Sequence, residues 1–156
     1  MMRRFIASVV FVLTFATLCF GVNGNKARYA GGTESQIKDN AEGPLSMKDD
    51  KDFLFISGKT TLSVPYDEVN DLEYGQKAGR RVGLAIALTP LALLSKKRKH
   101  YLTLGWKDEK GEQHVAIFEL GKHIVRTALA TIEARTGRKI VYQDDEARKS
   151  GMGGEL

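Results

Sequence analysis

The residue types that could bind a metal ion or transfer a proton are few and widely spaced. The chain has three histidines, His100, His114 and His123. A four-coordinate zinc site needs clustered ligands, but His100 and His114 fall toward opposite ends of the hairpin that the surrounding residues predict. The sequence therefore predicts partly exposed polar histidines, with no metal ion and no cofactor.

Two groups of carboxylates are equally poor candidates for chemistry. Asp49, Asp50 and Asp52 could hold calcium loosely, but Lys51 interrupts them and the twelve-residue ligand spacing of a calcium loop is absent. The acids at positions 144–146 fall in a predicted polar tail, whereas a general acid or base needs a fixed geometry. No phosphate loop, nucleophile elbow or HExxH helix occurs. These observations add no support for an enzyme, although a catalytic site assembled from distant residues stays open as an alternative.

The strongest functional signal is an uncharged segment between two groups of cations, RRVGLAIALTPLALLSKKRKH at Arg80–His100. The thirteen residues Val82–Leu94 contain no charge, and Thr89 is their only polar side chain. A helix of that length is about 20 Å long, against a hydrocarbon core of about 30 Å. Pro90 would also kink such a helix. The segment is therefore too short to span a membrane.

Two interpretations of this segment stay open. It can be a piece of core packed over an open part of the fold, with its cations solvated. It can instead be a surface that enters a membrane interface, where each cation near anionic lipid contributes about 1 kcal/mol. The partner is then an anionic lipid surface or an acidic envelope protein. The predicted binding residues are Arg80, Arg81, Leu84, Leu88, Leu91, Leu93, Lys96, Lys97, Arg98 and Lys99.

The N-terminus has the order of features that is typical of a secretory signal peptide. Residues 1–4 are cationic, Phe5–Phe20 is an unbroken apolar run, and residues 21–24 include small glycines. We therefore predict a signal peptide at 1–24 and an exported protein, periplasmic or secreted. The alternative is an uncleaved anchor, because sixteen apolar residues approach the lower limit of about 17 for a spanning helix. Cleavage removes Cys19, the only cysteine, so that no disulfide can form.

The positive charge is concentrated in one part of the chain. The formal net charge of +5 includes Arg3 and Arg4, so that residues 25–156 carry +3. Residues 76–100 carry +7 and no acid, which leaves −4 for the rest. A basic balance often indicates nucleic acid, but export favours anionic lipid or an acidic polymer, and we expect no nucleic-acid partner. The alternative is a solvated charged loop.

The first half of the chain predicts short antiparallel strands. Apolar side chains alternate with polar ones, which places them on one face of a strand. The charged stretch 49–52 and Ser57-Gly58-Lys59 separate the strands as turns, and Pro65 ends ladder pairing. Residues 25–43 alone resemble a linker, although ARYAGGT can form a first edge strand. The predicted strands are 27–33, 45–47, 53–56, 60–64 and 69–75.

The clearest hairpin joins YLTLGW (101–106) and HVAIFEL (114–120) through a loop in which Gly111 can take the left-handed conformation. Trp106 either packs in this sheet or stacks on a ligand, and the first is the commoner role of a hairpin aromatic. The same two interpretations apply to Tyr101.

The register of this hairpin is a separate prediction. If Lys107 lies opposite Glu112, Tyr101 and Phe118 meet on one face of the sheet. A bulge at Gly111 would shift this pairing. On the other face, the predicted register brings together Leu102, Leu104, Val115 and Ile117.

The periodicity changes after residue 120. Apolar residues recur at intervals of four, which predicts an amphipathic helix over 122–136, with Gly137 as its left-handed stop. Ile140 and Tyr142 predict one short strand. From Gln143 onward the chain is polar and rich in glycine, which predicts a flexible tail at 143–156. One domain at 25–142 accounts for the rest.

This order of elements carries a resemblance. LSVPYDEVNDLEYGQ, followed by KKRKHYLTLGWKDEKGEQHVAIFEL and a helix ending ARTG, resembles the bacterial pleckstrin-homology-like and GRAM-like domains. The resemblance implies an α+β, mainly β fold: an antiparallel β-barrel or sandwich with one C-terminal amphipathic helix and, here, an apolar insertion. It implies a binding or scaffolding module and not an enzyme. Lipid-binding members of these families place cations around the first hairpin, where this chain has DDKD. The resemblance therefore does not imply a phosphoinositide pocket in this chain.

Overall fold

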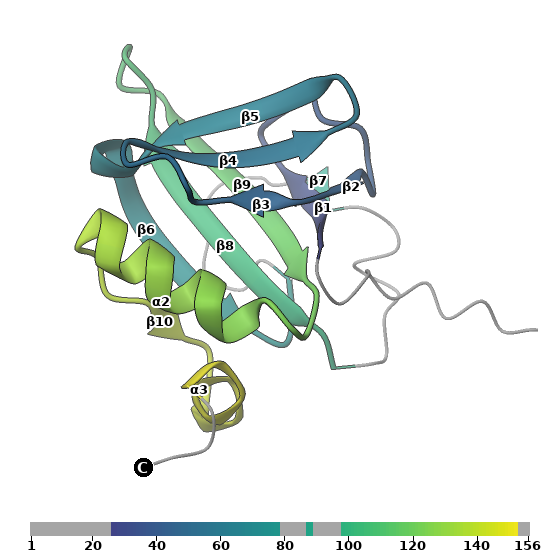
Figure 1. Cartoon of the computed structure of the whole chain (residues 1–156), viewed down its shortest axis with the longest axis vertical. Helices are drawn as coiled ribbons and strands as arrows, with labels where there is room; N and C mark the ends of the chain where they lie inside the picture. The colour runs from purple at the N-terminus through teal and green to yellow at the C-terminus, as the bar shows by residue number, and fades with distance from the viewer. Residues whose placement is uncertain (1–25, 79–86, 89–97, 153–156) are drawn as a thin grey trace, which may run out of the picture.

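The computed structural model describes residues 26–78, 87–88 and 98–152 (Figure 1). These residues have the predicted α+β, mainly β class, and they form two largely antiparallel sheets and two α-helices. The predicted signal peptide and most of the basic-flanked apolar segment lie outside the described residues. Within the described part of the chain, none of the helices has both the length and the apolar character needed to cross a membrane.

The larger sheet has the strand order β10-β6-β8-β9-β1-β2, and β7 also pairs with β1. Neighbouring strands are antiparallel except β10 and β6, which are parallel. The first strand is confirmed but is not an edge, because β1 pairs with β9 on one side and with β2 and β7 on the other. The strands are β1 (Ala27–Gly32), β2 (Glu42–Gly43), β6 (Val69–Gly75), β7 (Ala87–Leu88), β8 (His100–Lys107), β9 (Gln113–Leu120) and β10 (Val141–Tyr142).

The smaller sheet has the order β3 (Leu45–Ser46), β4 (Asp52–Ser57) and β5 (Thr60–Pro65). The predicted turns are confirmed: the acidic stretch joins β3 to β4, and the two residues between Ser57 and Thr60 join β4 to β5. After Pro65 the chain makes one turn of 3-10 helix, η1 (Tyr66–Glu68), and enters β6.

One bent segment, residues 42–46, pairs with both sheets. β2 pairs with β1 of the larger sheet, and β3, which follows directly after Pro44, pairs with β4 of the smaller one. The backbone N–H of Ile56 donates to the Pro44 carbonyl over 3.2 Å. A Cβ atom at Gly43 would lie 1.7 Å from the carbonyl oxygen of Ile56, so only glycine fits this bend.

The main core lies between the two sheets. Figure 1 shows the smaller sheet and helix α2 (Val125–Thr136) against the same face of the larger sheet. Phe53 and Phe55 of β4 contact the Phe118 ring of β9, with ring centroids 5.6 and 5.0 Å apart. The predicted apolar stripe of α2 is buried in this core.

Helix α2 confirms the predicted helix, although it begins three residues later, at Val125. The predicted C-terminal end of the helix at Gly137 is confirmed as well. Gly137 has φ of 65°, and its N–H donates to the Glu133 carbonyl over 3.0 Å. The predicted short strand after the helix is β10, which pairs with β6.

The register predicted for the β8–β9 hairpin is wrong by one residue. Lys107 pairs with Gln113, because the loop has five residues and Gly111 takes φ of 80°. A slip of one residue moves every side chain to the other face. Leu102 therefore lies opposite Phe118 in the main core. Tyr101 lies on the other face of the sheet, in a separate apolar cluster.

The prediction of a flexible polar tail from Gln143 onward is also wrong for the residues up to Met152. Residues Asp145–Met152 form helix α3, which begins where the Asp144 carboxylate accepts the Ala147 N–H over 2.7 Å. Ala147 is fully buried, and a Cβ at Gly151 would lie 2.9 Å from the Tyr142 ring. The helix packs through small residues, which a search for large apolar side chains does not detect.

Candidate functional site

The structure describes three of the ten predicted binding residues. Leu88 lies in β7, where its backbone is paired with Gly31 of β1. Arg98 and Lys99 directly precede β8. The remaining seven lie outside the described residues: Arg80, Arg81, Leu84, Leu91, Leu93, Lys96 and Lys97.

Lys99 is committed to an internal ion pair. Its Nζ lies 2.9 Å from Glu119 Oε2, and its side chain is only 11% exposed. Glu119 also faces Arg28, whose Nη1 lies 3.5 Å from the same oxygen. A charge this deeply buried needs its partner. We therefore assign Lys99 a role in the fold.

Arg98 differs, because its side chain is 71% exposed. Its guanidinium lies 2.8 Å from the Glu146 carboxylate of α3, which is exposed as well. Exposed ion pairs of this kind contribute little to stability. The Arg98 side chain can therefore exchange Glu146 for another anion at small cost.

The outward face of β1, β8 and β9 carries a second, smaller apolar cluster. Ala30, Tyr101, Val115 and Ile117 are at most 3% exposed, and Ala78 packs against them. Burial raises the pKa of Tyr101 to about 12. Tyr101 therefore belongs to the packing of the sheet, as the commoner of its two predicted roles requires.

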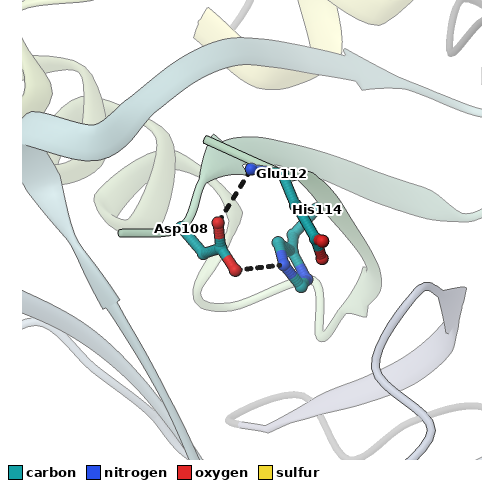
Figure 2. Close-up of side chains that lie close together, drawn as sticks. All are labelled: Asp108, Glu112 and His114. Atoms are coloured by element: carbon teal, nitrogen blue, oxygen red, sulfur yellow. Dashed lines mark hydrogen bonds and ion pairs between the residues drawn. The ribbon is translucent and has the colours of Figure 1, made fainter. Parts of the chain in front are cut away.

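A cluster of possible metal ligands lies where the β8–β9 hairpin turns (Figure 2). Asp108 and Glu112 are the first and last residues of the five-residue loop, and His114 is the second residue of β9. One side-chain atom from each of the three lies within 4.8 Å of the others. His114 Nε2 is 3.4 Å from Asp108 Oδ2.

The loop backbone holds the Asp108 carboxylate in place. Its Oδ1 accepts the N–H of Glu112 over 2.8 Å and that of Lys110 over 2.9 Å. The Glu112 bond is also the main cause that holds the pKa of Asp108 below its usual value. Asp108 is therefore ionised, and Oδ2 is the oxygen that faces His114 (Figure 2).

The His114 ring is oriented from two sides. Its Nδ1 lies 2.8 Å from Glu34 Oε1, and its ring stacks on Trp106 with a centroid distance of 5.4 Å and an interplanar angle of 21°. Partial burial lowers the pKa of His114, but its bonds to Glu34 and Asp108 outweigh burial, so that the pKa is raised overall. Trp106 is 6% exposed and is part of the sheet packing.

A hydrogen-bonded chain at the other end of β8 is structural. Tyr74 Oη lies 2.6 Å from His100 Nδ1 and 3.2 Å from Ser150 Oγ. The tyrosine separates the serine from the histidine, so the chain is not a nucleophile hydrogen-bonded to its base. Ser150 also donates to the Ala147 carbonyl over 3.0 Å. The chain ties α3 to β6 and β8.

The spacing of the three histidines does not reveal the Asp108–Glu112–His114 cluster, because only one histidine belongs to it. The useful signal is the spacing of two acids and one histidine around a single predicted loop. The comparisons with known proteins add no assignment: the chain matches no protein-family model and no curated protein.

Proposed function

We propose that this protein is a non-catalytic binding module that is exported and acts at a membrane surface or on an envelope protein. The binding part is the basic-flanked apolar segment between β6 and β8. A pleckstrin-homology-like architecture of the protein is part of the same proposal, supported by the two sheets and by helix α2, which packs beside the smaller sheet on one face of the larger one.

One observation carries this proposal: β6 and β8 are neighbours in the sheet, yet a long connection joins them. Gly75 at the end of β6 pairs with Tyr101 near the start of β8. Antiparallel neighbours need a loop of only about 2–5 residues, and much longer connections in compact domains are usually functional. The 24 residues from Gln76 to Lys99 therefore exceed what joining β6 to β8 requires, although two of them form β7 and pair with β1.

The composition of the connection supports an anionic partner. It combines the thirteen uncharged residues of Val82–Leu94 with cations on both sides. Lys99 is excluded from the binding set, because Glu119 holds its ammonium. Five cations remain to face lipid phosphates or acidic side chains: Arg80, Arg81, Lys96, Lys97 and Arg98.

Co-sedimentation of residues 25–156 with phosphatidylglycerol vesicles tests this function. We expect binding that falls more than about 100-fold when the five cations are replaced by glutamine, since each contributes about 1 kcal/mol at an anionic surface. The matched control replaces five other exposed cations and should bind as the parent does. These are Lys38, Lys59, Lys107, Lys122 and Arg126. Equal loss in both variants would show that only net charge matters and would refute the proposal.

The outward apolar cluster favours a second candidate function. Tyr101, Val115 and Ile117 are buried on the face away from the main core, and Ala78, near the start of the connection, packs against them. In this alternative the apolar segment packs on that face, and the protein is a soluble structural or inhibitory interaction domain.

Cysteine labelling separates the two candidates, because residues 25–156 contain no cysteine. If the segment faces a membrane or a partner, as in the first candidate, L84C and L91C react with a maleimide as fast as the exposed control K59C. In the second, they react as slowly as the buried control T103C. Slow labelling would reject the membrane-facing function.

A further inference from the structure

The structure assigns a metal-binding site to the turn of the β8–β9 hairpin: we propose that Asp108, Glu112 and His114 together bind one divalent transition-metal ion. The three residues supply one imidazole nitrogen and two carboxylates, with ligand atoms within 4.8 Å of one another. The site uses no residue of the connection between β6 and β8 and does not depend on the proposed function.

The setting of His114 is the first argument. Glu34 accepts the Nδ1 proton over 2.8 Å, which leaves the lone pair on Nε2. A metal-ligating histidine usually donates its other N–H to a carboxylate in this way. Nε2 is itself buried and accepts no hydrogen bond from the part of the chain that the structure describes. Its nearest acid, Asp108 Oδ2 at 3.4 Å, pairs with it only when the ring is protonated.

The setting of Asp108 is the second argument. Two backbone N–H groups occupy Oδ1, so Oδ2 is held toward the imidazole without any metal present. The Trp106 ring fixes the plane of the imidazole. Two of the three ligands are therefore already oriented by groups that do not themselves bind the metal, and Glu112, at the exposed end of the loop, completes the set.

Charge gives a third argument. The carboxylates of Asp108, Glu112 and Glu34 surround one imidazole, so the site is negative even when His114 is protonated. A divalent ion offsets this charge. A nitrogen and two carboxylate oxygens suit zinc, nickel and copper better than calcium or magnesium. In a tetrahedral arrangement, one position stays open to water or to a side chain from a partner.

The only tryptophan of the chain is the reporter for this site. Because Trp106 stacks on His114, Cu²⁺ bound there should quench its fluorescence. We expect residues 25–156, freed of metal by a chelator, to show quenching that saturates at one equivalent. Zn²⁺ should compete with Cu²⁺ for the site. Quenching that never saturates, or that needs several equivalents, would contradict a built site.

Four variants make the experiment specific. H114Q and E112Q should lose saturable quenching, and E112Q keeps the fold because the exposed Glu112 side chain is not packed in the core. E34Q should weaken binding by roughly 10- to 100-fold, which is typical for the partner of a metal ligand. H123Q, at an exposed histidine outside the site, should behave as the parent. Unchanged quenching in E112Q and H114Q would overturn the proposal.

Discussion

At the scale of single residues, two histidines of one hairpin occupy opposite electrostatic environments. Burial lowers the pKa of His100, against the smaller opposing effect of Glu119. The pKa of His114 is raised, because Glu34 and Asp108 outweigh the opposing effect of burial. His100 is thus neutral in the fold, whereas protonation of His114 strengthens its contacts in the absence of a metal.

The two histidines should give pH dependences of opposite sign. His100 contributes stability above its unfolded pKa of about 6.5, and this is lost as the pH falls below that value. His114 contributes stability below about 6.5, and this is lost as the pH rises through its higher folded pKa. The free energy of unfolding is measured with urea from pH 5 to 8, with a chelator present. H100Q should reduce the loss of stability toward pH 5, and H114Q should reduce the loss of stability toward pH 8. Identical curves for both variants would contradict these environments.

The buried ion pair of Lys99 makes a second prediction at this scale. Glu119 faces both Lys99 and Arg28, so E119Q should destabilise the fold by about 3–5 kcal/mol, the range for removing one partner of a buried pair. K99M should cost less, because Glu119 keeps Arg28. Both are measured by urea unfolding, and a larger loss in K99M would contradict the arrangement. If the pair holds Lys99 as described, K99M should also bind anionic vesicles as the parent does.

At the scale of elements, alternation and turn residues were enough to predict most strands of this fold. Leu62 and Val64 share a face, Pro65 ends β5, and Gly137 ends α2, because each depends on local backbone geometry. The hairpin register depends on loop conformation, and a five-residue loop with Asp108 as its hydrogen-bond acceptor cannot be distinguished from a shorter loop by alternation. The ligand cluster was missed for the same reason, since that loop brings it together.

Helix α3 gives the prediction at this scale. Ala147 is fully buried where α3 packs on the core, so A147N should destabilise the protein by about 1–3 kcal/mol through overpacking. R148Q, at an exposed neighbour, should stay within about 0.5 kcal/mol of the parent. Urea unfolding measures both. If A147N leaves the free energy of unfolding unchanged, the polar C-terminal segment is the unstructured tail that its composition predicts.

At the scale of the whole molecule, the segment Glu42–Ser46 joins the two sheets. G43A should therefore be far more damaging than its size suggests, because its Cβ would lie 1.7 Å from a backbone oxygen of β4. We expect a loss well above the typical 1 kcal/mol of a point substitution. G58A is the informative control: its turn has φ of 59°, but no atom of the described residues lies within 4 Å of an added Cβ. A smaller loss in G43A than in G58A would contradict the role of the bend.

Because Gly75 pairs with Tyr101, the sheet and the connection between β6 and β8 can respond to different selective pressures. Both ends of the connection leave the sheet from adjacent strands, about 5 Å apart. Substitutions and length changes on either side of β7 need not rebuild the ladder that holds β6 and β8. Under the proposed function, this lineage can acquire new recognition by altering one interval of the gene while the architecture that supports it is inherited intact.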